Sequence, residues 1–419
     1  MKFRNRAAAL GALPLSLVLA HSALAAAPAP QFGDPVKVNA DLTFDPIIDG
    51  RLRYEHVDQP TKDADAVTMR LRAGFEFKHL PSHLSLLAEA EGTLAIVDNY
   101  SAFPFASASH QVRPAYSVVA DPSNVELNRL QLQYKTKALT VTVGRQRINL
   151  DDQRFVGSVG WRQNEQTFDA VRGEAKIGPV SLDGTYSISQ RTIFGVDSGP
   201  RAGYGGDFIF LGAGLKAGPV QVKAFSYLLD YNEAFFFANS SQTYGARAVA
   251  ALPLSKTVKL NLAASYARQS RYGTNPTAYT ADYLAGEAGI AAMGFSVTGG
   301  YESLGSNGAK SFQTPMATLH KFNGWADIFL TTPAGGLQDI YGGVAYKFDG
   351  IKALPGLNAA VTYHQFDSDV GNVNYGHEWD AAVGFKVRKV GILAKYADYK
   401  ALGFGTSTKK FWIQAEFAF

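Results

Sequence analysis

Residues 67–78 read Val-Thr-Met-Arg-Leu-Arg-Ala-Gly-Phe-Glu-Phe-Lys, and this stretch is the clearest indication of the fold class. Apolar and polar residues alternate along it, so in a strand Met69 and Phe75 would share one face while Arg70 and Glu76 would share the other. A strand of a soluble sandwich can show the same period. Here, however, charges fill the polar face, and the stretch is as long as a tilted strand that crosses a membrane. The pattern favours a strand with one face toward lipid and the other toward a polar interior.

Segments of this kind recur along the chain, and about eighteen can be placed, which is within the range of membrane barrels. The connections between them alternate between short turns and long loops, the longest of which lie near 98–123 and 305–336. This alternation is typical of outer-membrane barrels, and an even strand number puts both chain ends on one side. We therefore predict an all-β fold, a transmembrane antiparallel β-barrel of about eighteen strands with both termini periplasmic. The predicted strands lie near 47–57, 65–78, 83–97, 124–137, 138–148, 165–177, 179–191, 206–217, 219–231, 240–252, 256–269, 278–291, 293–304, 337–349, 356–367, 375–388, 389–399 and 407–419.

Composition excludes the main competing fold classes. Charged residues make up 18% of the 419 residues and aromatic residues 12%, and the 41 glycines mark many turns. Beyond the N-terminal leader, no run reaches the ~18 consecutive apolar residues that a membrane-spanning helix needs. Abundant aromatic residues and a net charge of only +4 argue against a disordered chain. The absence of cysteine excludes disulfides, thiolate metal sites and cysteine nucleophiles.

The N-terminus has the features of a secretory signal. Three basic residues (Lys2, Arg4 and Arg6) precede an apolar stretch at 7–20, and Ala23-Leu24-Ala25 fits a cleavage site. The expected location is the outer membrane of a Gram-negative cell, after secretion through the inner membrane. We predict a signal peptide at 1–25, an N-terminal periplasmic segment at 26–46 and the barrel at 47–419.

The last strand ends on Phe419, with Phe411 and Ile413 on one face and Trp412 and Gln414 on the other. A terminal Phe on such a strand resembles the signal that the bacterial barrel assembly machinery reads. The expected partners are therefore this machinery, outer-membrane lipid and lipopolysaccharide, and an anionic or sugar solute. No nucleic-acid partner is expected, since the chain without its leader is close to charge balance. Aromatic residues near strand ends fit interfacial girdles.

The polar face carries an excess of arginine in the first half of the chain. Arginine offers a planar fork of donors that fits carboxylates and phosphates, so such a wall would favour anions. The alternative is that these arginines pair with interior acids and only stiffen the barrel, and both roles can hold at once. Arg145 and Arg147 share parity with lipid-facing residues, so we expect them above the membrane or in the lumen. The predicted pore-lining residues are Arg51, Arg53, Arg70, Arg72, Glu89, Glu91, Arg129, Lys135, Arg145, Arg147, Arg172, Arg191 and Arg247.

Motifs for catalysis and cofactor binding are missing from the sequence. It contains no GxSxG, no HExxH and no P-loop. The neighbouring His79 and His83 flank a proline turn, and the Asp151-Asp152 pair is a weak calcium signal. We therefore expect no enzyme, no cofactor, no metal and no catalytic residue.

Two segments resemble a known family. Residues 144–169 begin Gly-Arg-Gln-Arg-Ile-Asn-Leu, and residues 312–333 begin Phe-Gln-Thr-Pro-Met-Ala-Thr-Leu-His. Both resemble the alginate-export family of outer-membrane β-barrels, the second segment in its porin-like members. The resemblance implies an eighteen-stranded barrel with an Arg-lined constriction for an anionic sugar polymer. It also implies that this lining includes Arg129, Arg145, Arg147 and Arg172.

One departure from that family favours diffusion over export. The alginate exporter has a long periplasmic turn that plugs its pore, whereas every periplasmic turn inferred here has about eight residues or fewer. Loop 305–336 is apolar and aromatic, so we expect it to fold into the barrel mouth as a constriction that includes Phe322, Trp325 and Asp327, with Trp325 buried. The leading hypothesis is an outer-membrane porin that lets small anionic or saccharide solutes diffuse passively. The alternatives are an export channel for an acidic exopolysaccharide such as alginate, a barrel enzyme, and a barrel with a blocked lumen.

Overall fold

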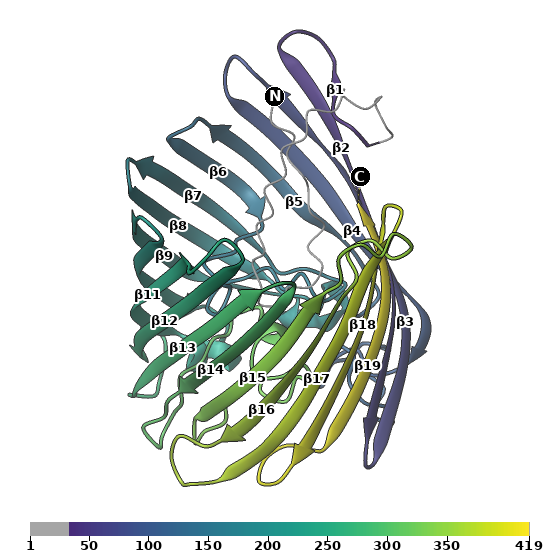
Figure 1. The fold of residues 1–419 in the computed structure, drawn as a ribbon, viewed down its shortest axis with the longest axis vertical. Coiled ribbons are helices and arrows are strands. Elements are labelled where there is room, and N and C mark those ends of the chain that lie inside the picture. The colour runs from purple at the N-terminus through teal and green to yellow at the C-terminus, as the bar shows by residue number, and fades with distance from the viewer. Residues whose placement is uncertain (1–32, 419) are drawn as a thin grey trace.

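The computed structural model describes residues 33–418, which form one closed antiparallel barrel (Figure 1). Each strand pairs with its neighbours in the sequence, and β19 closes the barrel on β2. Within the described residues eighteen long strands build the wall, as predicted, and the two-residue β1 adds to β2. The strands are β1 (Val36–Lys37), β2 (Leu42–Gln59), β3 (Lys62–His79), β4 (Leu84–Asn99), β5 (Asn124–Lys135), β6 (Leu139–Gln146), β7 (Thr167–Ile177), β8 (Val180–Arg191), β9 (Gly203–Ala217), β10 (Val220–Tyr231), β11 (Ser241–Pro253), β12 (Val258–Arg271), β13 (Thr280–Ala292), β14 (Phe295–Leu304), β15 (Leu337–Lys347), β16 (Asn358–Asp367), β17 (Asn374–Val387), β18 (Val390–Ala401) and β19 (Thr408–Ala418).

The connections differ in two places from the predicted alternation. β2 and β3 are joined by residues 60–61 alone, although this turn lies at the end of the barrel that carries the long loops. At the opposite end the longest turn is 348–357, slightly longer than predicted. The predicted signal peptide at 1–25 lies outside the described residues. The first wall strand begins at Leu42, ahead of the predicted boundary at 47.

Burial along the strands is inverted relative to a soluble protein. On β3 the apolar Met69 and Leu71 are 44% and 48% exposed, whereas Arg70, between them, is fully buried. The same alternation runs around the wall, so the outside of the barrel is apolar and the inside carries the charges. A closed barrel pairs all its strand backbones, which is the condition for strands to cross lipid. No helix among the described residues has the length and apolar content to cross a membrane.

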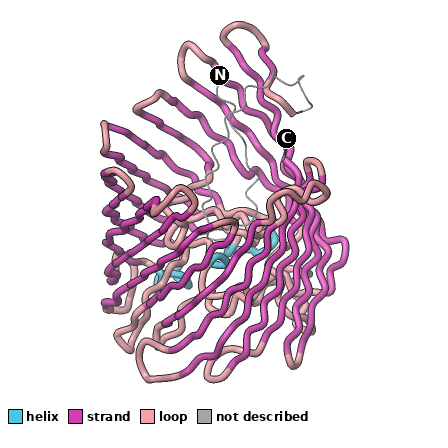
Figure 2. Tube along the Cα trace, in the orientation of Figure 1, coloured by secondary structure: helices cyan, strands magenta, loops and turns pink. Residues whose placement is uncertain are grey.

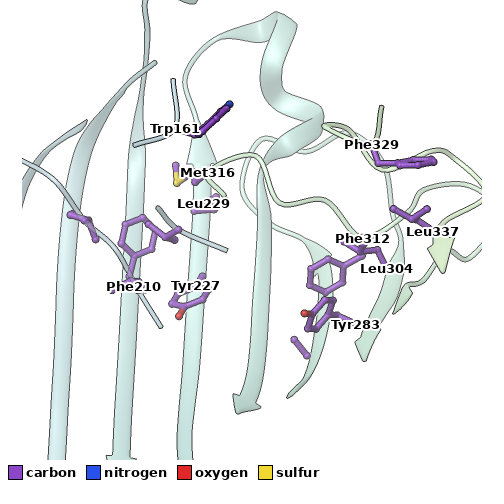
Figure 3. Close-up of a cluster of buried hydrophobic side chains, with 14 of the residues drawn as sticks. Trp161, Phe210, Tyr227, Leu229, Tyr283, Leu304, Phe312, Met316, Phe329 and Leu337 are labelled. Carbon is purple, nitrogen blue, oxygen red and sulfur yellow. The ribbon is translucent and has the colours of Figure 1, made fainter. Parts of the chain in front are cut away.

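The interior holds a packed core as well as polar groups. Aromatic side chains from β9 and β10, including Phe210 and Tyr227, belong to one buried cluster with Met316 and Phe312 of loop 305–336. Phe312 itself lies beside Tyr283 of β13 (Figure 3). Figure 2 shows loops and the short 3₁₀ turns η1 (Val196–Arg201), η2 (Ala234–Asn239) and η3 (Leu319–Lys321) grouped in one part of the barrel. The long loops therefore fold against the inner wall, as the sequence predicted for 305–336.

Candidate functional site: the barrel interior

Two loops meet inside the barrel and are joined backbone to backbone. Loop 147–166 follows β6 and loop 305–336 follows β14. Val156 and Met316 form a parallel bridge, and the Gly157 amide donates to the Met316 carbonyl at 2.9 Å. The Thr318 amide donates to the Gln153 carbonyl at 3.1 Å. The two loops, residues 147–166 and 305–336, therefore form one connected layer inside the barrel, which we call the partition.

The partition covers the arginines of β2. Arg51 and Arg53 both donate to the carbonyl of Trp161, at 2.9 and 2.6 Å, and the Arg53 guanidinium lies 4.0 Å from the Trp161 ring centre. Across the barrel seam Arg51 also pairs with Glu416 at 3.1 Å. These two arginines face inward, as predicted, but they are buried under the loop and hold it against the wall.

The arginines of β3 are buried in the same way. Arg72 pairs with Glu91 of β4 and, at 2.9 Å, with Glu165 of loop 147–166. Burial alone would raise the pKa of the Glu165 carboxyl, but Arg147 and Arg72 hold it well below its usual range. The neighbouring Arg70 pairs with Asp49 and is fully buried. Buried ions need partners of opposite charge, and here the neighbouring strands supply Asp49 and Glu91 while the loop adds Glu165.

Asp327 is the point where loop 305–336 is fixed to its surroundings. Its carboxylate accepts from Arg162 at 2.6 Å, from Lys410 of β19 at 3.0 Å and from His320 at 2.7 Å. Although burial alone would raise it, the pKa of Asp327 lies well below its usual range because His320, Lys410 and Arg162 surround it. Asp327 therefore acts as an ionic anchor inside the barrel.

His320 connects this anchor to a lysine of the wall. Lys395 of β18 donates to His320 Nε2 at 2.8 Å, and its Nζ lies 4.1 Å from the Trp161 ring centre and 3.6 Å from that of Trp325. Lysine only donates, so Nε2 must accept, and the ring is neutral with its Nδ1 proton donated to Asp327. Burial also lowers the pKa of His320 well below its usual value. Trp325 is partly buried, less completely than predicted.

Other predicted wall residues keep some contact with the lumen. Glu89 is buried and holds Arg129 at 2.6 Å and Arg147 at 3.0 Å, yet both arginines remain partly exposed. Arg172 pairs with Asp183, Arg191 lies 3.5 Å from Glu126, and Arg247 lies 2.8 Å from Asp152, all with partial exposure. Lys135 is the exposed last residue of β5.

Arg145 does not belong to the interior. It lies opposite Leu130 of β5, which is 46% exposed on the apolar outer surface, and opposite Asp169 of β7. Its guanidinium pairs with Asp169 at 2.8 and 3.0 Å. Of the two places expected for Arg145, above the membrane or in the lumen, the lumen was wrong, and so was its place among the pore-lining residues. The strand keeps its register to Gln146, and the carboxylate of Asp169 on the outer face neutralises the charge. Arg147, beyond the end of the strand, does turn inward to Glu89 and Glu165.

A cavity of about 220 Å³ remains between loop 305–336 and strands β11 to β17. Sequence reasoning singled out only part of its lining. The sequence offered one signal for the lining residues that were missed, namely a charged residue such as Lys321 on an apolar loop that is expected to fold inward. The lining includes Asp152, Arg247, Tyr283, Glu287, Glu302, Lys321, Phe322, Asn323, Trp325, Asp339, Tyr341, His364 and Asp380.

Comparisons with known proteins agree with this architecture. A family model for alginate export matches residues 58–188. This match confirms the resemblance. It includes residues 144–169, while residues 312–333 lie beyond it. No curated protein matches the sequence.

Several solved structures share the fold at low sequence identity. OpdL of Pseudomonas aeruginosa superposes with a TM-score of 0.67 and 15% identity, over 90% of this chain and 98% of that one. The outer membrane protein OpdK of the same organism gives 0.68 and 12% over 90% and 98%. OccK2 (OpdF), also from P. aeruginosa and solved with glucuronate, gives 0.68 and 11% over 90% and 97%. The predicted fold class, an antiparallel barrel of eighteen strands, is confirmed.

Proposed function

We propose that this protein is an outer-membrane channel through which small anionic or saccharide solutes diffuse passively. The observation that carries the proposal is the inverted burial of a closed barrel, apolar outside and charged inside. An apolar outer surface of this kind is stable in lipid, and a charged interior is suited to hydrated solutes. The chain acts as a channel rather than as an enzyme.

The fold comparisons support this assignment. OpdK is an outer membrane protein that has been solved with vanillate, and OccK2 has been solved with glucuronate. Both ligands carry a carboxylate. In this chain Arg129, Arg172 and Arg247 remain partly exposed to the interior and offer spare N–H groups to such an anion. The working environment is outer-membrane lipid and lipopolysaccharide, reached through the barrel assembly machinery.

Export of an acidic polysaccharide is the second candidate, because the matching family model is that of alginate export. Diffusion of small solutes is better supported, since two loops joined by backbone hydrogen bonds cross the interior. A polymer would need a continuous wide path past this partition.

The test is the reversal potential of the refolded protein in a planar bilayer under a salt gradient. We expect anion selectivity, and we expect Arg129→Gln with Arg172→Gln to weaken it. Arg268→Gln is the matched control, because Arg268 lies on the outer face and is 60% exposed. Cation selectivity would contradict the anionic substrate class, and a protein that never conducts would contradict the channel itself.

A further inference from the structure

The cavity beside loop 305–336 contains one cation and one anion that the protein leaves without an ionic partner. Lys321 Nζ donates to the backbone carbonyl of Asp152 at 2.7 Å and has no ion pair among residues 33–418. Glu287 accepts from the hydroxyl of Tyr341 at 2.8 Å and likewise has no ion pair in the described part of the chain. Both residues line the cavity.

The other charges of the cavity are already compensated. Glu302 accepts from Arg154 at 2.7 Å, and Asp339 accepts from His364 at 2.9 Å. The third carboxylate, Asp380, lies 3.8 Å from the other ring nitrogen of His364 and accepts from the Trp325 amide at 3.2 Å. Arg247 is 2.8 Å from the Asp152 carboxylate. Internal pairing thus leaves Lys321 as the available positive group and Glu287 as the available negative group.

The cationic end has two donors close together. Asp152 holds Arg247 through its side chain and Lys321 through its backbone carbonyl, so both cations meet at one residue. Burial lowers the pKa of Lys321, while Asp152 and, to a smaller extent, Glu287 at the other end of the cavity oppose the change. A bound carboxylate would supply the negative charge that Lys321 lacks.

The position of Glu287 at the anionic end of the cavity depends on a glycine. Glu287 of β13 lies opposite Gly300 of β14, which lies opposite Tyr341 of β15. A β-carbon on Gly300 would overlap the Tyr341 ring, so only glycine lets the ring cross β14 and reach Glu287. This arrangement fixes the Glu287 carboxylate at the cavity wall.

The cationic and anionic ends of the cavity are separated by about the length of a small molecule. Arg247 lies opposite Ser265 of β12, and Glu287 lies opposite Ala263 of the same strand. Two strand spacings and a two-residue offset put the Cα atoms of Arg247 and Glu287 about 12 Å apart. Both residues line the cavity, whose volume of about 220 Å³ has room for a solute of a few carbon atoms. Phe322 and Trp325 supply an apolar wall.

We propose that the cavity binds a small solute that carries both a carboxylate and an ammonium group, as an amino acid does. The carboxylate binds Lys321 and Arg247, the ammonium binds Glu287, and the carbon chain packs against the aromatic wall. This inference rests on the proposed channel function and names its substrate class.

The test is block of single channels in a planar bilayer by three matched probes. 4-Aminobutyrate has both charged groups, butyrate has only the carboxylate, and butylammonium has only the cation. We expect 4-aminobutyrate to reach half block at a concentration about tenfold below that of either single-charge probe, since it makes one more charge-assisted contact.

Two variants separate the ends of the site. Glu287→Gln is expected to reduce block by 4-aminobutyrate to the level of butyrate, and Lys321→Gln to the level of butylammonium. Lys321→Arg should restore binding. Asp349→Asn, in a turn and 82% exposed, is the control that leaves all three probes unchanged. Equal block by the three probes in a conducting channel would overturn this inference alone, whereas a protein that never conducts would overturn the proposed function.

Discussion

Replacing Asp327 with asparagine should release loop 305–336 from the barrel wall. The carboxylate accepts from Arg162 at 2.6 Å, Lys410 at 3.0 Å and His320 at 2.7 Å, and its side chain is 4% exposed. Asparagine keeps the shape and one acceptor but removes the charge that two buried cations need. Breaking a buried ion pair costs ~3–5 kcal/mol, and the retained acceptor puts the expected loss near the lower end. A loss of about 3 kcal/mol raises the population of the detached loop by about 100-fold.

Hydrogen exchange measures this change at the loop itself. The amides of Trp325 and Ala326 donate to the wall carboxylates Asp380 and Glu378, at 3.2 and 2.7 Å. They should exchange about 100-fold faster in Asp327→Asn, because exchange follows the open population. Asp183→Asn, which breaks a partly exposed pair, should leave both amides unchanged. Unaltered exchange at Trp325 and Ala326 in the Asp327 variant would refute the anchor role.

Three further outcomes follow from the interior. His320 is neutral in the attached loop, whereas the histidine of a detached loop gains a proton below about pH 6.5. The free energy that holds the loop to the wall therefore falls by ~1.4 kcal/mol per pH unit until the lowered pKa of His320 is reached. Conductance recorded from about pH 7.5 to 5 should change accordingly, and His320→Gln should flatten the change. Arg53→Met should lower the temperature of heat unfolding, since breaking its buried contacts costs ~3–5 kcal/mol, yet leave the reversal potential unchanged; a shifted potential would show that Arg53 meets the permeating ion. Gly300→Ala should displace Tyr341 and alter block by 4-aminobutyrate, whereas Gly173→Ala, where an added β-carbon meets nothing within 4 Å, should not.

The wall of the barrel could be predicted from the sequence because its signals are local. Alternation with period two fixes which side chains share a face, and turns such as Gly178-Pro179 interrupt it where strands end. All eighteen predicted strands are present, and Arg51, Arg53, Arg70 and Arg72 do face inward. The ends of the strands were predicted less accurately. For example, β2 begins at Leu42, whereas the predicted strand begins at 47.

The accessibility of the inner side chains could not be predicted, because it depends on loops that are distant in sequence. Trp161 covers Arg51 and Arg53 from more than a hundred residues away, and nothing local to β2 specifies this contact. The position of Arg145 was also mispredicted, in this case because of a neighbour on the adjacent strand. Its charge argued for a position above the membrane or in the lumen, but Asp169, on the neighbouring strand, neutralises the charge and allows Arg145 to stay on the outer face.

The excess of arginine on the inner wall nevertheless carried information about the loops. Among the acids of β2 and β3, Asp49 pairs with Arg70 and Arg72, whereas Asp45 and Glu76 pair with Lys78 and Glu55 pairs with Arg162. Buried charge is stable only when it is compensated. Part of the compensation therefore has to come from elsewhere, and Glu165 and Asp121 supply it from the loops. Once those pairs form, the arginines contribute little to the field that a solute meets. Selectivity then depends on charges that stay in contact with the lumen. These are the partly exposed Arg129 and Arg172 and, in the described cavity, Lys321 and Glu287.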